Sequence, residues 1–465
     1  MRAKQLFKPV VGQKRLDLRF EHLRTSPVAK AAREMLNDVF RNFVDTDGNF
    51  VEQFQTTGFD SRFFELYLHA YLSRSGYQID RHHPNPDFLI TRDGITVALE
   101  ATTVNASRSG AVAKFGKTIK DLTEEQRGEY GANELPIRFG SALLSKLRRR
   151  YWKMPHCSSV PFVIAIEAFH DEGSLSFSDS ALATYLSGLR HSASWDEHHE
   201  LIFEAEKVAS HQLGDKEIPS GFFGQPETEF LSAVLFTNSG TSAKFSRMGY
   251  QSGYANDTLN IKRLGRCYNP NPSAMDSTLF SYDLDDPPFI ERWGDGLVVF
   301  HNSKALRPLP RLFFDADSEW VREGNDYVPY IRGWNTYRSE TLVNHVGKLK
   351  KRIPKIMIMH GPQMVEAIDE ERFHLLNPSA RSSPKLDETG WFADQSEGFL
   401  GLVFKNAKSR WSFVVFARDE YFLFRPIGRK SGYRMRVLAC EGVQFAILNY
   451  LLRPQRIFPR DKKKS

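Results

Sequence analysis

The sequence predicts an α/β protein whose core is built from a helix, a mixed β-sheet and a second helix. Three observations lead to this fold class. Apolar residues recur at helical spacing before Gly76, two strand-like runs joined by Asp93-Gly94 follow, and a second helical stretch precedes the nearly continuous apolar run Val160–Ala168. A run of that kind is typical of a strand buried on both faces, so we expect it to continue the sheet.

The first helix is expected between Asp60 or Ser61, which could cap its N-terminus, and Gly76, which could end it. Its apolar positions form one broad stripe (Phe64, Tyr67, Leu68, Tyr71 and Leu72). Glu65 lies beside this stripe. It is open whether Glu65 is a functional acid or an ordinary first-turn acid stabilised by the helix dipole.

The two strands Asp87–Thr91 and Ile95–Val104 are expected to form a hairpin, because Asp-Gly is a strong type I′ turn signal. If Asp93 and Gly94 are the loop residues, Arg92 pairs with Ile95 and Asp87 faces Glu100. Alternation then places the two acids on the face opposite to an apolar one formed by Phe88, Ile90, Ile95, Val97 and Leu99.

The two facing carboxylates are expected to repel each other unless their charge is neutralised. Directly opposed residues have Cβ atoms roughly 4.5 to 5.5 Å apart, and like charges at that spacing destabilise a hairpin. Mg²⁺ or Mn²⁺ would offset the repulsion, since both take oxygen ligands. A proton shared by Asp87 and Glu100, or acids that point outward into water, are the alternatives.

The order of Glu65 on a helix, Pro86-Asp87 on one strand and Glu100-Ala101-Thr102 on the next resembles the PD-(D/E)XK, or restriction-endonuclease-like, nuclease superfamily. The resemblance implies that Asp87, Glu100 and the carbonyl of Ala101 bind the metal and that Glu65 is an auxiliary acid. Thr102 departs from the pattern, because it stands where the family usually has a lysine.

The second helix, expected over Ile137–Met154, offers a replacement for that lysine. Lys146, Arg149 and Lys153 fall beside its apolar stripe. Some members of the superfamily carry the catalytic cation on this helix, so the resemblance implies that Lys146 takes this role. A basic helix face that is solvated or contacts phosphate is the alternative, and Arg149 is a candidate for such a contact.

The rest of the chain is expected to form three parts: a basic helical extension (1–50), the nuclease-like domain with inserted loops (51–330) and a basic α+β domain (331–465). We expect a helix over Ser26–Phe43, a short helix over Ser178–Leu189 and strands at Leu231–Thr237 and Leu297–His301. Residues 105–136, 191–200 and 238–296 are interpreted as loops. The last part is expected to hold a helix (Glu340–Ile353) and strands at Ile356–His360, Phe399–Phe404, Trp411–Ala417 and Tyr421–Arg425.

The net charge of +7 is concentrated at the two ends of the chain. Residues 1–45 hold ten Lys/Arg against five Asp/Glu, and residues 405–465 hold fifteen against four. This distribution favours a partner with a phosphate backbone, and DNA in particular, rather than a membrane. The expected phosphate contacts in the C-terminal part are Arg429, Lys430, Arg434 and Arg436. Three widely spaced cysteines and the lack of a long apolar run favour a cytoplasmic location.

These features predict a Mg²⁺- or Mn²⁺-dependent nuclease that hydrolyses phosphodiester bonds of DNA, similar by analogy to restriction or phage-defence effectors. Two alternatives stay open. The Thr102 substitution favours a catalytically inactive nucleic-acid-binding protein on the same scaffold. The run from Gly110 to Gly116-Lys117-Thr118 nearly matches a P-loop of a nucleotide hydrolase, but its spacing is one residue too long. Protein partners and a homo-oligomer are left open.

Overall fold

The computed structural model describes residues 5–105, 122–170, 179–195, 201–255, 258–269, 277–285, 287, 290–332 and 335–345, together with five strands between 366 and 433. The chain divides into two compact units. The first contains residues 1–285 and 291–353, and the second contains residues 286–290 and 354–465. This division differs from the three expected parts, because residues 1–50 share the core of the first unit.

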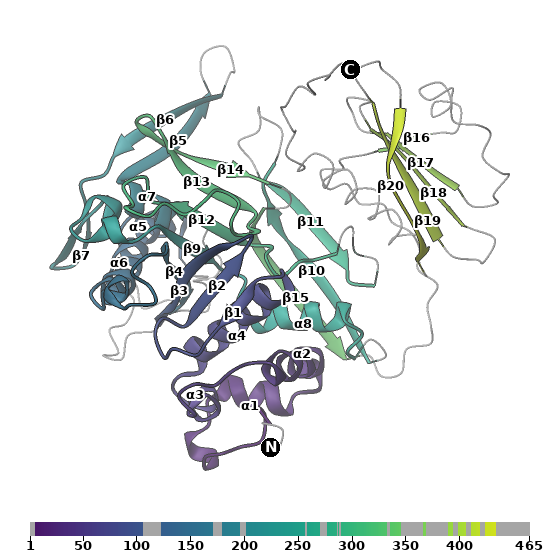
Figure 1. The fold of residues 1–465 in the computed structure, drawn as a ribbon, viewed down its shortest axis with the longest axis horizontal. Coiled ribbons are helices and arrows are strands. Elements are labelled where there is room, and N and C mark those ends of the chain that lie inside the picture. Colours follow the sequence, from purple (N-terminus) through teal and green to yellow (C-terminus); the bar gives the residue numbers. More distant parts are fainter. Residues whose placement is uncertain are drawn as a thin grey trace, which may run out of the picture. The chain divides into compact units, whose positions relative to one another are not determined.

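An eight-stranded mixed sheet organises the first unit (Figure 1). The pairs β3–β4, β4–β9 and β12–β13 are parallel, and the other neighbours are antiparallel. The predicted α/β class with a mixed sheet is therefore confirmed. In spatial order the strands are β1 (Gln78–Asp80), β2 (Phe88–Arg92), β3 (Ile95–Asn105), β4 (Phe162–Phe169), β9 (Ala233–Thr237), β12 (Leu297–His301), β13 (Ser318–Glu323) and β14 (Asp326–Ile331).

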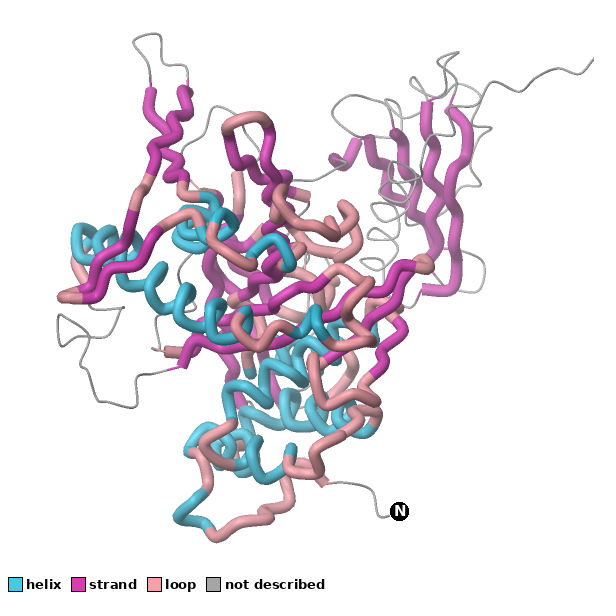
Figure 2. Tube along the Cα trace, turned by 60° about the vertical axis from the view of Figure 1, so that its left-hand side comes forward, coloured by secondary structure: helices cyan, strands magenta, loops and turns pink. Residues whose placement is uncertain are grey.

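Two hydrophobic cores cover the two faces of this sheet. On β4, Val163 and Ala165 belong to one core, while the alternate residues Ile164 and Ile166 belong to the other. The first core includes the helices near the N-terminus, which gather below the magenta strands in Figure 2. They are α1 (Leu18–Thr25), α2 (Lys30–Arg41), α3 (Phe50–Gln55) and α4 (Phe59–Arg74). The second core is covered by α6 (Leu135–Leu147) and α7 (Ser180–Ser187).

The hairpin between β2 and β3 has the predicted register. Phe88 pairs with Leu99 and Arg92 pairs with Ile95. Asp93 and Gly94 have φ angles of 51° and 78°, as a type I′ turn requires. The predicted apolar face is buried except at the tip of the hairpin, where Ile95 is 36% exposed.

The two predicted helices that flank the hairpin begin and end at other residues than expected. The first, α4, has Gly58 rather than Asp60 or Ser61 as its N-cap. A Cβ atom at Gly58 would lie 2.9 Å from the Cβ of Gln53, so this close approach favours glycine. The second, α6, ends at Leu147 instead of Met154, because Arg150 adopts a left-handed conformation (φ 54°) before the 3₁₀ turn Tyr151–Lys153.

Several segments interpreted as loops are regular elements. Residues 191–195 of the segment interpreted as a polar loop belong to β5 (Leu189–Trp195), which pairs with β6 (Leu201–Lys207), and residues 196–200 lie outside the described residues. Residues 238–296 contain α8 (Ser242–Gln251), β10 (Leu259–Cys267) and β11 (Thr278–Asp283). Within 105–136 lies α5 (Glu124–Glu129), which begins with a capping box between Thr123 and Gln126, followed by a π-helical turn (Tyr130–Glu134). A further hairpin joins β7 (Ser210–Leu213) to β8 (Lys216–Pro219).

The expected helix Glu340–Ile353 is wrong over its first residues. They belong to β15 (Thr336–His345), which pairs with β10 in a three-stranded sheet of the first unit. β-branched residues such as Thr341 and Val343 suit a pleated strand better than a helix. The remainder of that expected helix lies outside the described residues, as does the expected strand Ile356–His360.

The described part of the second unit is an antiparallel sheet in chain order. It confirms the predicted strands at 399–404 and 411–417, and the third predicted strand overlaps the start of β20. The strands are β16 (Glu366–Ile368), β17 (Thr389–Ala393), β18 (Phe399–Lys405), β19 (Trp411–Arg418) and β20 (Phe424–Tyr433). Among the described residues, no helix combines the length and apolar character needed to cross a membrane.

Candidate active site

Asp87 and Glu100 come together where β2 begins beside β3. The backbone N–H of Asp87 donates to Oε2 of Glu100 (3.1 Å), and the N–H of Ala101 donates to Oδ2 of Asp87 (2.8 Å). Each carboxylate is therefore fixed by the backbone of the other residue or its neighbour. This arrangement agrees with the register that the sequence predicts for the pair.

The Glu100 carboxylate receives two further donors from the segment that covers this face of the sheet. Lys146 Nζ lies 2.5 Å from Oε1 of Glu100, and the Tyr151 hydroxyl donates to the same oxygen (2.6 Å). Lys146 is in the last turn of α6, and the left-handed Arg150 lets the chain bring Tyr151 back toward β3. The carboxylate of Glu100 is buried, with a side chain only 4% exposed.

The electrostatics of the site favour neutralisation of Asp87, by a proton or by a cation. Burial raises the pKa of Asp87 well above its ordinary value, and the charges of Glu100 and Glu65 raise it further. Lys146 and the Ala101 N–H act in the opposite direction without reversing the shift. Burial and Glu100 also raise the pKa of Tyr151, so its hydroxyl stays protonated and serves as a donor.

Glu65 occupies a different environment from the one expected for a metal ligand. It is buried and paired with Arg62 (2.7 Å) and with Arg81 (3.4 Å). The guanidinium of Arg81 lies between the rings of Phe43 and Phe88, 4.1 and 4.6 Å from their centroids. Glu65 thus holds a stacked arginine beside the hairpin, and the geometry gives no support to a direct role on the metal.

Thr102 and Ala101 complete the residues that the resemblance singled out. Thr102 is half-buried on β3 and follows Glu100 on the same face of the strand. Lys146 of α6 places an amine 2.5 Å from Oε1 of Glu100, two residues before Thr102 on the strand. Continuing the register of the hairpin places Pro86 opposite Ala101. Because proline has no N–H, Pro86 donates no hydrogen bond to the carbonyl of Ala101.

The oxygen atoms present suit one small divalent ion held largely by water and substrate. Within the described chain, Asp87 Oδ1 has no hydrogen-bond partner, whereas Glu100 already accepts three bonds. Among these residues, no group of three or more His, Cys, Asp or Glu side chains is arranged to hold a metal. Mg²⁺ is commonly bound by only one or two carboxylates plus water and phosphate, so the pair fits that mode and not a closed cage.

The remaining expected residues fall in three places. Arg149 is exposed just after α6. Its positive charge acts to lower the pKa of the nearby Tyr151, against the larger effects that raise it. Arg429 and Lys430 lie in β20, opposite Val414 and Phe413. Arg434 and Arg436 lie outside the described residues, and so does the P-loop-like run with Lys117.

Sequence reasoning missed two residues of the site. Tyr151 has the helical spacing of an apolar-stripe residue, which conceals its role, although a buried tyrosine usually needs a partner for its hydroxyl. Arg81 gave no signal, because its partner Glu65 and its stacking rings come from distant parts of the chain.

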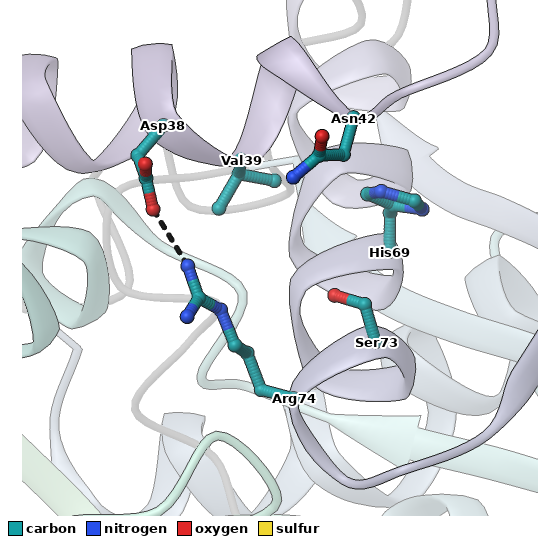
Figure 3. Close-up of a pocket in the computed structure, with 6 residues that line it drawn as sticks. All are labelled: Asp38, Val39, Asn42, His69, Ser73 and Arg74. Carbon is teal, nitrogen blue, oxygen red and sulfur yellow. Dashed lines mark hydrogen bonds and ion pairs between the residues drawn. The ribbon is translucent and has the colours of Figure 1, made fainter.

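A pocket of about 260 Å³ lies between α2 and α4 (Figure 3). Its walls carry the Asp38–Arg74 ion pair (2.6 Å) and the buried His69. Burial and the charge of Arg81 lower the pKa of His69 to about 4, so the imidazole is neutral near pH 7. Neither Asp87 nor Glu100 lines this pocket, which is therefore separate from the acidic pair.

Comparison with known protein families, curated proteins and solved structures finds no match to this chain. The functional assignment therefore depends on the geometry of the site.

Proposed function

We propose that this protein is a divalent-metal-dependent nuclease that hydrolyses phosphodiester bonds of nucleic acid, with DNA as the substrate expected from charge, on a restriction-endonuclease-like core. One observation carries the proposal. Asp87 and Glu100 are held side by side on adjacent strands, with Lys146 Nζ 2.5 Å from Glu100. Two acids and one amine in one small volume are the set of groups that metal-assisted phosphodiester hydrolysis uses.

The charge balance of the cluster supports a bound cation. Lys146 neutralises one of the two carboxylates, and Asp87 is left with an unpartnered Oδ1 among the described residues. A divalent ion at Asp87 and Glu100 would lower the pKa of a bound water and stabilise charge on the scissile phosphate. Its binding would also relieve the repulsion that raises the pKa of Asp87.

The protein's own groups would orient the reactants. The Ala101 N–H and the Tyr151 hydroxyl fix the two carboxylates in place before substrate arrives. The Lys146 ammonium has three donor positions, and Glu100 uses one of them, so it can also donate to a phosphate oxygen or to an attacking water. Pre-positioned donors of this type are a main source of catalytic rate enhancement.

The test is cleavage of labelled single-stranded and double-stranded DNA in the presence of Mn²⁺. The wild-type protein should cleave, and Asp87→Asn should abolish cleavage. Asp93→Asn is a matched control, because Asp93 is exposed at the hairpin tip and asparagine tolerates its positive φ. Equal activity of the Asp87→Asn and Asp93→Asn variants would refute a catalytic role for the acidic pair.

A second candidate is a nucleic-acid-binding protein without catalytic activity. It is favoured by the ion pair between Lys146 and Glu100, which can neutralise the buried carboxylate without a metal. Binding of DNA without cleavage in Mn²⁺ or Mg²⁺ by the wild-type protein would identify this function. The connection with restriction or phage defence and the cytoplasmic location remain proposals by analogy.

A further inference from the structure

Two histidines from distant parts of the chain stack on each other beside the acidic pair. The rings of His83 and His156 have centroids 3.8 Å apart and an interplanar angle of 4°. His156 Nε2 donates to the backbone carbonyl of Asn85 (2.8 Å), two residues before Asp87. The same short segment therefore carries Asp87 and supports the stacked pair.

Only one side of this stack is open. His156 is half-buried, and its ring covers one face of the His83 ring, whereas His83 is exposed. The exposure of His83 therefore belongs to its other face and its edges. Coplanar rings cannot direct two nitrogens at one ion, so the pair is poorly suited to chelating a metal.

Basic residues precede His156 in the chain. Arg148, Arg149 and Lys153 are exposed, and none of them forms an ion pair with another described residue. Arg150, by contrast, is paired with Glu227 (2.7 Å). These three cations lie within eight residues of His156 in the chain, and His156 stacks on the exposed His83. Cations that contact phosphates and a flat ring that stacks on a base are the combination that binds a single strand.

We propose that the outer face of His83 is a stacking platform for an unpaired nucleobase. The preferred ligand is then a single-stranded segment of DNA or RNA, whose backbone contacts Arg148, Arg149 and Lys153. This inference rests on the proposed nucleic-acid function and specifies its substrate. A base within a blunt duplex has both faces covered and cannot use the platform.

The test is fluorescence-anisotropy binding in the Asp87→Asn background without divalent metal, so that cleavage does not enter the measurement. The ligands are a short oligothymidylate, the matching oligouridylate and a blunt DNA duplex. His83→Ala should weaken binding of the single strands by about 5- to 150-fold, the range expected for loss of one base–aromatic stack, and should leave duplex binding unchanged. His83→Phe, which keeps an aromatic face, should retain single-strand affinity.

His82→Ala is the matched control. His82 is the neighbouring exposed histidine, but its Nδ1 bonds to the Asp80 carboxylate (2.6 Å) and its ring stacks on no other described ring. It should bind like the background protein. Three outcomes would overturn the platform: equal losses of single-strand affinity in His82→Ala and His83→Ala, an unchanged affinity in His83→Ala, or an affinity of His83→Phe as weak as that of His83→Ala. A comparison of the thymidylate and uridylate losses decides whether DNA, RNA or both use it.

The two proposals fail in different ways. Loss of single-strand binding in His83→Ala, in a protein that cleaves neither DNA nor RNA, refutes the nuclease and supports the platform. Cleavage that depends on Asp87, with unchanged binding by His83→Ala, supports the nuclease and refutes the platform.

Discussion

Lys146 Nζ and Glu100 Oε1 lie 2.5 Å apart, although one residue is at the end of a helix and the other is in the middle of a strand. The lysine side chain is 22% exposed and the glutamate side chain 4% exposed. The amine therefore faces a buried carboxylate on one side and remains reachable from solvent on the other. A residue with this access can interact with both the acidic pair and a bound phosphate.

The first prediction concerns the removal of that amine. Lys146→Met should lower nuclease activity by about 100- to 1000-fold, the effect typical of losing one pre-positioned donor. The physical reason is that methionine keeps the length of the side chain but removes the positive charge. The measurement is the single-turnover cleavage rate in Mn²⁺.

Lys153→Met is the control for this substitution. It removes a lysine from the same segment, but Lys153 is exposed and pairs with no other described residue. At saturating DNA its single-turnover cleavage rate should stay within a few-fold of the wild type, because the proposed phosphate contact of Lys153 affects binding and not the chemical step. If the two variants lose activity equally, Lys146 contributes only to the general positive charge of the segment.

The second prediction concerns pH and Asp87. The pKa of Asp87 is raised in the folded protein, whereas it is about 4 in the unfolded chain. At a pH between these two pKa values, Asp87 is protonated in the native state and ionised in the unfolded state. Stability from this group therefore falls as pH rises through that window. Asp87→Asn should raise the melting temperature at pH 7 in the presence of chelator, and the gain should disappear below about pH 4.

Metal addition gives the complementary result. Mn²⁺ should raise the melting temperature of the wild-type protein by binding the native state, and it should not do so for Asp87→Asn. A melting temperature of Asp87→Asn that equals or falls below the wild-type value at pH 7 would show that Asp87 carries no electrostatic penalty.

The third prediction separates Glu65 from the metal site. Glu65→Gln leaves the stacked and buried Arg81 without a charged partner, and Arg62 with only the exposed Asp47 at 4.0 Å, so it should destabilise the fold by about 3 kcal/mol. The concentration of Mn²⁺ needed for half-maximal cleavage should stay unchanged. Urea unfolding and a Mn²⁺ titration of the cleavage rate provide the two measurements.

Glu52→Gln is the matched control for stability. Glu52 pairs with Arg15 at the surface, where both side chains are at least half exposed, and such pairs contribute less than about 1 kcal/mol. A large increase in the Mn²⁺ requirement of Glu65→Gln would instead show that Glu65 is a ligand, as the resemblance implies.

The hairpin was predictable because its register follows from local chemistry. Asp93-Gly94 specifies the turn, and the period of two then pairs Phe88 with Leu99 and brings Asp87 beside Glu100. Helical spacing places Lys146 next to the apolar stripe of α6, but its choice as the replacement for the missing lysine also needed the resemblance to the nuclease superfamily. The register of the hairpin needs only the neighbouring residues.

Long-range arrangements were not predictable in the same way. The pairing of β15 with β10 joins segments separated by a long stretch of chain, and no local pattern indicates it. Three of the four residues His191–Ser194 in β5 are polar, so hydrophobic periodicity gave little indication of a strand there. The stacking of His83 was not predictable either, because its partner, His156, lies far away in the sequence.

The fourth prediction concerns a buried ion cluster away from the acidic pair. Glu291 accepts bonds from Lys244 (2.8 Å) and Arg247 (2.7 Å), and Arg263 lies 3.5 Å away. All four side chains are at most 4% exposed. The three cations hold the pKa of Glu291 well below its ordinary value despite burial, so the carboxylate stays ionised.

Glu291→Gln should destabilise the protein by about 3 to 5 kcal/mol near pH 7, because it leaves three buried cations without a counter-charge. The stability that Glu291 provides is fully present above its unfolded pKa of about 4.3 and is lost as pH falls through the lower folded pKa. The difference between variant and wild type should therefore shrink in acid. Urea unfolding at pH 7 and at acidic pH measures this difference in stability. Glu340→Gln is the control, because Glu340 forms an exposed pair with Arg338 and its loss should change stability by less than about 1 kcal/mol. A Glu291→Gln variant as stable as that control would mean that α8 and β10 are held together by apolar packing and not by the buried charges.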